Sequence, residues 1–108
     1  KAWSYWRTTL AGLVKGTFKS IGKITSQKMN HINVSKHLWS KVMKKVTNTQ
    51  ITNLIYKGIR VGEWILQDNG SIKIKYNYGK EIIVITGKVV NNVFHIGNAW
   101  VWNGKGTP

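Results

Sequence analysis

The chain has 108 residues, enough for one domain with a single hydrophobic core and too few for a second domain. It holds 17 lysine and arginine residues against three acidic ones, for a net charge of +14, and it contains no cysteine. The missing cysteines exclude disulfide bonds, thiol catalysis and thiolate metal sites, and no apolar run approaches the roughly 20 residues that span a bilayer.

The first 60 residues carry the patterns of a small helical lobe. Residues 1–22 place apolar side chains at helical spacings of three and four; these are Trp3, Trp6, Leu10, Leu13 and Val14. Residues 35–46 predict a second helix with Ser35 as its N-cap. Residues 49–58 predict a third helix, which Gly58 ends. The segment before Ser35 is expected to be a loop.

Residues 61–102 predict an antiparallel meander, because four runs rich in Ile, Val, Tyr and Trp alternate with strong turn signals. The four strands are 63–67, 71–78, 81–90 and 93–102. Alternation along the last strand predicts one shared face for Phe94, Ile96, Asn98, Trp100 and Trp102. The glycine-rich residues 103–108 predict a flexible tail. The predicted fold class is α+β, with an N-terminal helical lobe packed on a four-stranded antiparallel twisted sheet.

Charge is distributed unevenly along the chain. All three acidic residues, Glu63, Asp68 and Glu81, follow position 62, and twelve basic residues precede it. Lysines without neighbouring carboxylates repel one another until a polyanion neutralises them. The expected partner is therefore nucleic acid, an anionic membrane surface or an acidic protein, and RNA fits best. Under the membrane hypothesis, residues 3–18 would lie on the surface as a basic amphipathic helix.

Histidine is the residue type left to carry catalysis. Three scattered carboxylates disfavour paired-carboxylate and two-metal mechanisms, which need several acids in one place. His31 and His37 lie six residues apart, and two imidazoles can divide RNA cleavage between a general base and a general acid. The competing interpretation is that both are surface residues or that one satisfies a helix end. His95 is expected to be a packing or rim residue at a half-buried strand position, with a direct role in catalysis as the alternative.

Lysines and aromatic residues complete the set of candidates. Lys36 and Lys41 lie near the histidines in sequence, and Lys73, Lys75 and Lys88 reach from the sheet to stabilise phosphate charge. The large side chains expected to anchor the core are Trp3, Trp6, Trp39, Trp64 and Trp100. The aromatic residues expected to stack on unpaired bases are Tyr76, Tyr78 and Trp102.

Several short motifs carry a family resemblance. They are Asn30-His31-Ile32, Lys36-His37-Leu38-Trp39, Ile85-Thr86-Gly87-Lys88-Val89-Val90 and Phe94-His95-Ile96-Gly97-Asn98-Ala99-Trp100. With them the chain resembles the C-terminal toxin domains of bacterial polymorphic and contact-dependent inhibition systems. It is most similar to the EndoU-like ribonucleases of the barnase, EndoU, colicin and RelE group. The resemblance covers roughly residues 28–102.

The resemblance implies a metal-independent endoribonuclease without cofactors that leaves a 2′,3′-cyclic phosphate. His31 and His37 match the histidine positions of the pattern, and Lys88, Thr86 and Asn98 would hold the phosphate. The substrate-binding residues would be Lys36, Lys41, Trp100 and Tyr76. In the last strand, Asn98-Ala99-Trp100 stands where such families often carry Thr-x-Tyr or Thr-x-Phe, so the roles of Asn98 and Trp100 stay open.

The resemblance also implies a biological setting. Toxins of this group are delivered as the C-terminal part of a larger secreted or cell-surface bacterial protein, and they act in the cytoplasm of the target cell. The chain itself is expected to be a monomer. Transfer RNA is a common substrate class, and a cognate acidic immunity protein neutralises the toxin. The missing initiator Met fits such an origin. The alternative function is a non-catalytic basic module that binds RNA or DNA.

Overall fold

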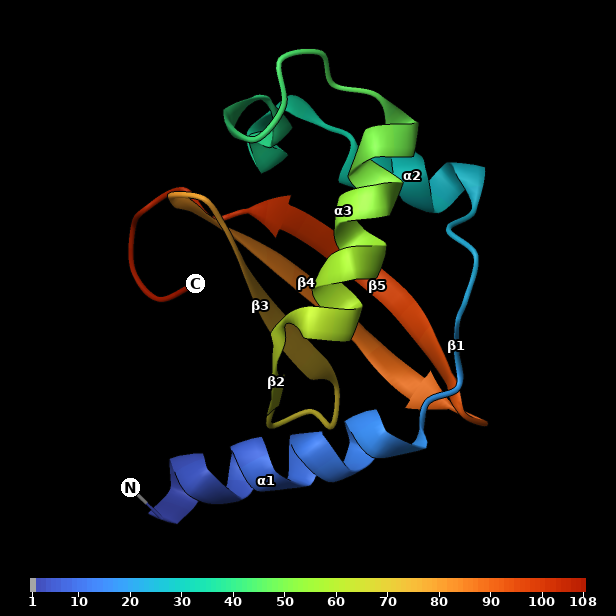
Figure 1. Cartoon of the computed structure of the whole chain (residues 1–108), viewed down its shortest axis with the longest axis vertical. Helices are drawn as coiled ribbons and strands as arrows, with labels where there is room; N and C mark the ends of the chain where they lie inside the picture. Colours follow the sequence, from blue (N-terminus) through green and yellow to red (C-terminus); the bar gives the residue numbers. More distant parts are fainter. Residues whose placement is uncertain (1) are drawn as a thin grey trace.

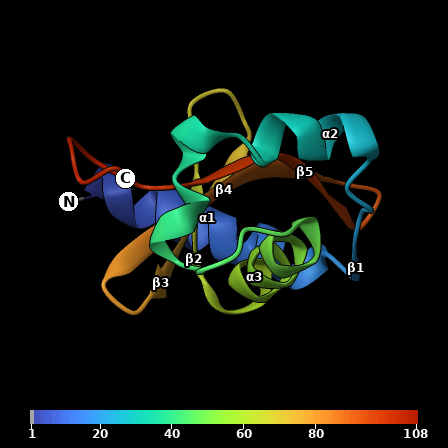
Figure 2. The same cartoon turned by 90° about the horizontal axis from the view of Figure 1, so that it is seen from above.

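The computed structural model describes residues 2–108, with side chains from residue 9 onward. Within these residues the chain forms an α+β fold of three α-helices and a five-stranded, mostly antiparallel sheet (Figures 1 and 2). The helices are α1 (Ala2–Thr17), α2 (Ser26–Ile32) and α3 (Asn48–Val61), with two 3-10 turns, η1 (Ser35–His37) and η2 (Trp39–Lys41), before α3. The strands are β1 (Ser20–Ile21), β2 (Glu63–Leu66), β3 (Ile72–Tyr78), β4 (Glu81–Val90) and β5 (Val93–Val101).

The sheet contains the predicted meander and one further strand. Strands β2 to β5 follow one another in antiparallel pairs, and their ends differ from the prediction by at most one residue. The prediction of four strands is wrong, because β1 pairs in parallel with the start of β5 and the order is β1-β5-β4-β3-β2. A strand of two residues is too short to show alternation, so no pattern in the sequence marks it.

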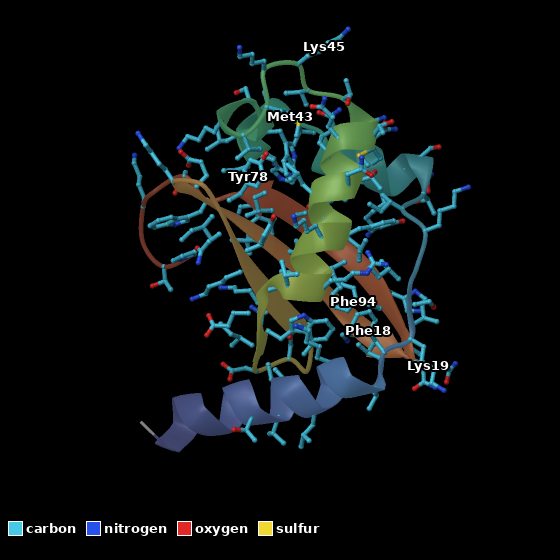
Figure 3. The ribbon with its side chains drawn as sticks, viewed as in Figure 1. Phe18, Lys19, Met43, Lys45, Tyr78 and Phe94 are labelled. Carbon is cyan, nitrogen blue, oxygen red and sulfur yellow. The ribbon has the colours of Figure 1, made fainter. Side chains whose placement is uncertain are left out.

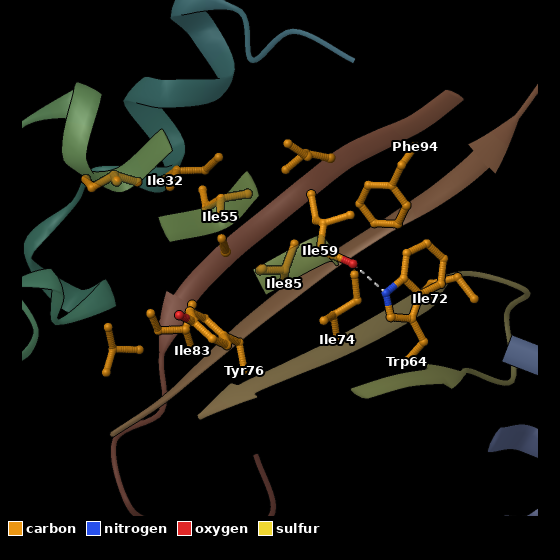
Figure 4. Close-up of a cluster of buried hydrophobic side chains, with 14 of the residues drawn as sticks. Ile32, Ile55, Ile59, Trp64, Ile72, Ile74, Tyr76, Ile83, Ile85 and Phe94 are labelled. Atoms are coloured by element: carbon orange, nitrogen blue, oxygen red, sulfur yellow. Dashed lines mark hydrogen bonds between the residues drawn. The ribbon is translucent and has the colours of Figure 1, made fainter. Parts of the chain in front are cut away.

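Helix α3 crosses one face of the sheet and supplies the centre of the core (Figures 1 and 4). Ile51, Ile55 and Ile59 lie four residues apart on one side of the helix and are fully buried. Thr47 is the N-cap, and its Oγ1 accepts a hydrogen bond from the Gln50 amide at 3.2 Å.

The helix continues through Gly58, where the sequence predicts its end. A Cβ atom at Gly58 would lie 2.7 Å from Cδ1 of Ile85, so the glycine allows close approach of the helix to the sheet instead of capping the helix.

The strands present two faces. The core face lies under α3 and carries the buried side chains of Ile72, Ile74, Tyr76, Ile83, Ile85, Phe94, Ile96, Ala99 and Val101. The outer face carries Lys73, Lys75, Val84, Thr86, Lys88, His95, Asn98 and Trp100.

A β-bulge in β5 determines which residues reach each face. Thr86 pairs with Asn98 but the next residue, Gly87, pairs with Ile96, so Gly97 is the extra residue of the bulge. The strict alternation predicted for residues 93–102 is therefore wrong. Ile96 faces the core, whereas Asn98 and Trp100 face outward.

Residues 35–46 do not form the predicted helix. They make η1 and η2, which are separated by Leu38 in the left-handed region with φ of 62°. The carbonyl oxygen of Ile32 accounts for the break, because it accepts hydrogen bonds from Nδ1 of His37 at 3.0 Å and from Nε1 of Trp39 at 2.8 Å. Side chains two residues apart on a continuous helix point in different directions and do not converge on one acceptor.

Helix α2 occupies the segment that the sequence predicts to be a loop. Thr25 is its N-cap, with Oγ1 accepting from the Lys28 amide at 3.1 Å, and His31 lies in its last turn. Ser35 is not an N-cap, since Val34 holds that position before η1 without a side-chain hydrogen bond. Strand β1 and helix α2 both lie against β5 and lead the chain to the end of that strand, where η1 and η2 lie (Figure 1).

Helix α1 packs against β2 and ends at Thr17, earlier than the predicted residue 22. Phe18 stacks on Trp64 with ring centroids 5.3 Å apart, and Nζ of Lys15 lies 6.0 Å from the Trp64 ring. Nε1 of Trp64 donates to the carbonyl oxygen of Ile59 at 2.9 Å (Figure 4). These contacts tie α1 and α3 to the same indole.

The expected core tryptophans divide into three groups. Trp39 and Trp64 are 2 % and 4 % exposed, which confirms them as core anchors. Trp100 is half-buried on the outer face instead. The side chains of Trp3 and Trp6 lie outside the described residues.

The chain ends beside the sheet. Nε1 of Trp102 donates to the carbonyl oxygen of Lys105 at 3.0 Å, and Nζ of Lys73 donates to that of Pro108 at 2.9 Å, so the tail that the sequence predicts to be flexible makes two defined contacts. Among residues 2–108, no helix combines the length and the apolar character needed to cross a membrane.

Candidate active site

The outer face gathers four of the nine predicted site residues. Cross-strand pairing arranges its side chains in rows, because directly paired residues point to the same side of a sheet. The rows are Lys73, Thr86 and Asn98; Lys75, Val84 and Trp100; and Lys88 and His95. The sequence motifs therefore pointed to residues that occupy neighbouring positions of one basic surface: Thr86, Lys88, Asn98 and Trp100.

A hollow of about 510 Å³ opens at one end of this face. Thr86, Lys88 and His95 line it from β4 and β5, and the turn at residues 67–71 closes one side. In that turn, Oγ of Ser71 lies 2.8 Å from Oε1 of Gln67. Of the two expected roles of His95, packing is wrong and a rim position fits, because its side chain is exposed and borders the hollow next to Lys88. Its outward direction is the one that alternation with Phe94 and Ile96 predicts, because His95 precedes the bulge in the strand.

His37 lies at the other end of the outer face, and its ring is oriented by the backbone. The residue is 9 % exposed, and its ring centroid is 6.2 Å from that of Trp100. A carbonyl oxygen only accepts, so Nδ1 carries the proton in the 3.0 Å hydrogen bond to Ile32. In the neutral imidazole, Nε2 then keeps its lone pair and is the atom able to take a proton.

His31 lies in the last turn of α2, and its exposure differs from that of His37. It is exposed, whereas His37 is buried. Since His37 donates to the residue next to His31 in the chain, standard backbone dimensions keep Cα of His31 within about 10 Å of Nδ1 of His37. The two residues therefore lie near each other: His37 satisfies the last carbonyl of α2, as the competing interpretation expects, and His31 is exposed in the last turn of that helix.

Asn98 presents one defined polar group. Its Oδ1 accepts a hydrogen bond from the Ala99 amide at 2.9 Å. The amide nitrogen Nδ2 is then the group of Asn98 that remains to donate to a phosphate oxygen. This contact gives the amide an orientation that the sequence did not predict.

Three predicted substrate-binding residues have different settings. Tyr76 lies on the core face and is 9 % exposed, so its predicted stacking role does not fit its burial. Nζ of Lys41 lies 3.8 Å from a carboxylate oxygen of Glu81, and this pairing reduces the charge that Lys41 offers to a phosphate. Lys36 is exposed beside His37 in η1.

Potential metal ligands and similarity to known proteins are two further guides to the function of this surface. In the part of the chain that the structure describes, no three His, Asp or Glu side chains come together as potential metal ligands. The chain matches no protein-family model, no curated protein and no solved structure. The residues of the outer face and of the adjoining turn at His37 are therefore the guide to function.

Proposed function

We propose that this protein is a metal-independent endoribonuclease whose active site is the outer face of the sheet. The observation that carries the proposal is the hydrogen bond from His37 to Ile32, which leaves Nε2 of a held imidazole as a proton acceptor beside Trp100. The basic surface next to it supports RNA as substrate, because phosphate attraction dominates the affinity of such surfaces for nucleic acids.

The reaction is an internal transesterification. His37 takes the proton of a 2′-hydroxyl, whose oxygen attacks the adjacent phosphorus, and the bond from phosphorus to the 5′-oxygen breaks. His31 donates a proton to that leaving oxygen. The products are a 2′,3′-cyclic phosphate and a free 5′-hydroxyl, so atoms and charge balance without a metal or a redox partner.

Donors on the outer face stabilise the phosphate in this scheme. Thr86 and Asn98 contribute a hydroxyl and an amide from paired positions of β4 and β5. Lys88 lies two residues farther along β4, on the side away from His37, and contributes charge to a neighbouring phosphate. Preorganised donors of this kind are each worth about 10²–10³ in rate when they contact the charge that develops in the transition state. Lys36, next to His37, holds a flanking phosphate.

A toxin role extends the same proposal. Cleavage of RNA inside a cell would arrest growth, and a net charge of +14 favours an acidic protein as the neutralising partner. Transfer RNA is the substrate class to examine first. Expression should be toxic, and an acidic immunity protein should relieve the toxicity.

The test is incubation of the protein with total RNA in EDTA, with fragment ends identified by mass spectrometry. We expect cleavage to persist and to leave 2′,3′-cyclic phosphate ends. His37→Asn is the matched variant, because its amide Nδ2 can still donate to Ile32 O while Nε2 is lost. It should lower the cleavage rate by about 10²–10⁴ and leave the unfolding temperature nearly unchanged.

Two results would overturn the mechanism. One is loss of cleavage in EDTA, and the other is full activity after both His31 and His37 are replaced by alanine. Tight, salt-dependent RNA binding without any strand scission would instead support a non-catalytic binding module on the same basic surface.

A further inference from the structure

A second hollow lies away from the outer face, at the end of the molecule where η2 meets the β3–β4 hairpin. Its volume is about 490 Å³, within the usual range for small-ligand sites. Three segments form it: the loop after η2, the first turns of α3 and the end of β3. Its lining residues are Val42, Met43, Lys44, Lys45, Gln50, Asn53, Leu54 and Tyr78. Figure 3 shows Met43, Lys45 and Tyr78 gathered at this end.

The inner surface of the hollow is apolar and carries an accessible aromatic ring. Val42, Met43 and Leu54 are partly buried against the core. Tyr78 is 40 % exposed, and its ring packs on Tyr76 with centroids 6.1 Å apart and an interplanar angle of 55°. The buried Tyr76 therefore supports Tyr78 from one side while ring surface stays open to a ligand.

The rim of the hollow is polar and positively charged. Lys44 and Lys45 are exposed on the loop, and Gln50 and Asn53 are exposed one helical turn apart on α3. No acidic residue is among the lining residues described. Glu81, which pairs with Tyr78 across the hairpin, forms the ion pair with Lys41 that joins η2 to the hairpin.

We infer that this hollow binds one unpaired nucleotide of RNA, with the base on Tyr78 and the neighbouring phosphates at Lys44 and Lys45. A flat apolar surface beside amides suits a base, whose face stacks and whose edge forms hydrogen bonds. Two lysines without a carboxylate in the lining suit its phosphates. The inference rests on the proposed function for the choice of RNA, and it adds a binding site on a different surface from the catalytic residues.

The test measures binding of a fluorescent 12-nucleotide 2′-O-methyl oligouridine, which cannot be cleaved because its 2′-oxygens are blocked. Tyr78→Ala should weaken binding by about 5- to 100-fold, and Tyr78→Phe should stay within about twofold of the unchanged protein because it retains the ring. With an abasic strand of equal length, Tyr78→Ala and the unchanged protein should bind equally well.

The lysines have their own control. Replacing Lys44 and Lys45 by alanine should reduce the slope of log affinity against log salt by about 1.4, the value for two phosphate contacts to a single strand. The control pair is Lys19→Ala with Arg60→Ala; Lys19 lies at the opposite end of the molecule (Figure 3), and Arg60 is in the last turn of α3. This control pair should change the slope of log affinity against log salt by less than the Lys44 and Lys45 substitutions do.

Three outcomes would overturn the inference: no effect of Tyr78→Ala, an equal effect with the abasic strand, or displacement of the oligouridine by oligoglutamate with the same dependence on Tyr78. The last outcome would assign the hollow to an acidic protein segment. If the unchanged protein cleaves RNA and Tyr78→Ala does not alter binding, only this inference fails. If binding depends on Tyr78 but RNA is never cut, only the proposed catalysis fails.

Discussion

The core face and the outer face of the sheet come from alternate residues of the same strands, yet they differ in exposure and chemistry. On β3, Ile72 and Ile74 are buried under α3, while Lys73 and Lys75, which alternate with them, are only partly buried on the other side. The core face is made of branched and aromatic side chains that pack, whereas the outer face carries lysines, an amide, a hydroxyl and an imidazole beside Val84 and Trp100. The core face stabilises the fold, and the outer face combines exposed polar side chains with the buried Val84 and with Lys73, which donates to Pro108.

The division between the two faces depends on one extra residue in β5, Gly97. Without the bulge at Gly97, the second half of β5 would turn Asn98 and Trp100 toward the core and Ala99 and Val101 outward. The bulge thus lets Phe94 and Ile96, at even positions, share one core face with Ala99 and Val101, at odd positions. It also places Asn98 opposite Thr86, within the proposed phosphate site.

Deletion of Gly97 should break the division between the faces and have the largest effect on stability. Strict alternation would then bury an amide and expose core residues, so we expect the free energy of unfolding to fall by more than about 4 kcal/mol. Urea denaturation measures the loss. Gly97→Ala is the control, because its nearest neighbour, Thr86 O, is 3.4 Å from the Cβ position, and it should change stability by less than about 1 kcal/mol. A deletion variant as stable as the unchanged chain would contradict this role of the bulge.

A cavity in the core tests the stabilising face alone. Ile55→Ala should lower the free energy of unfolding by about 2–5 kcal/mol, since Ile55 is fully buried between α3 and the sheet. RNA affinity, measured at a temperature where the variant is still folded, should stay within about twofold of the original value. A large loss of affinity in the folded variant would mean that the two faces are coupled.

Removal of two outer-face lysines tests the binding face alone. Lys73→Ala with Lys88→Ala should reduce the salt dependence of single-stranded RNA binding by about 1.4 in the log–log slope and leave the unfolding temperature within a few degrees. Lys57→Ala with Arg60→Ala on α3 is the matched pair from the other side of the sheet. Equal slopes for the two pairs would show that net charge, and not the outer face, determines binding.

The smallest expected effect comes from a valine-to-threonine substitution made once on each face of the sheet. Val90, the last residue of β4, is 50 % exposed, so Val90→Thr should change the free energy of unfolding by less than about 0.5 kcal/mol. Val101 is 1 % exposed on the core face, and Val101→Thr should cost about 1–3 kcal/mol because it buries a hydroxyl. Similar costs at both positions, read from thermal unfolding, would contradict the assignment of the faces.

The strands β2 to β5 and most of helix α3 were determined by the sequence itself. Their signals are local: turn residues at each strand end, β-branched runs between them, and isoleucines four apart in the helix. The sequence also pointed to Thr86, Lys88 and Asn98, which the strand register brings onto one surface. Such patterns are readable because each element has an apolar face that must be buried.

Only the tertiary structure decided where His37 and Asn98 point. The turns at residues 35–41 depend on one carbonyl, that of Ile32, which accepts from two side chains and thereby outweighs the helical pattern. The bulge at Gly97 and the parallel pairing of β1 depend on contacts with β4 and β5. Hydrogen bonds and packing between distant segments leave no periodic trace along the chain, and here they orient the residues proposed to act on RNA.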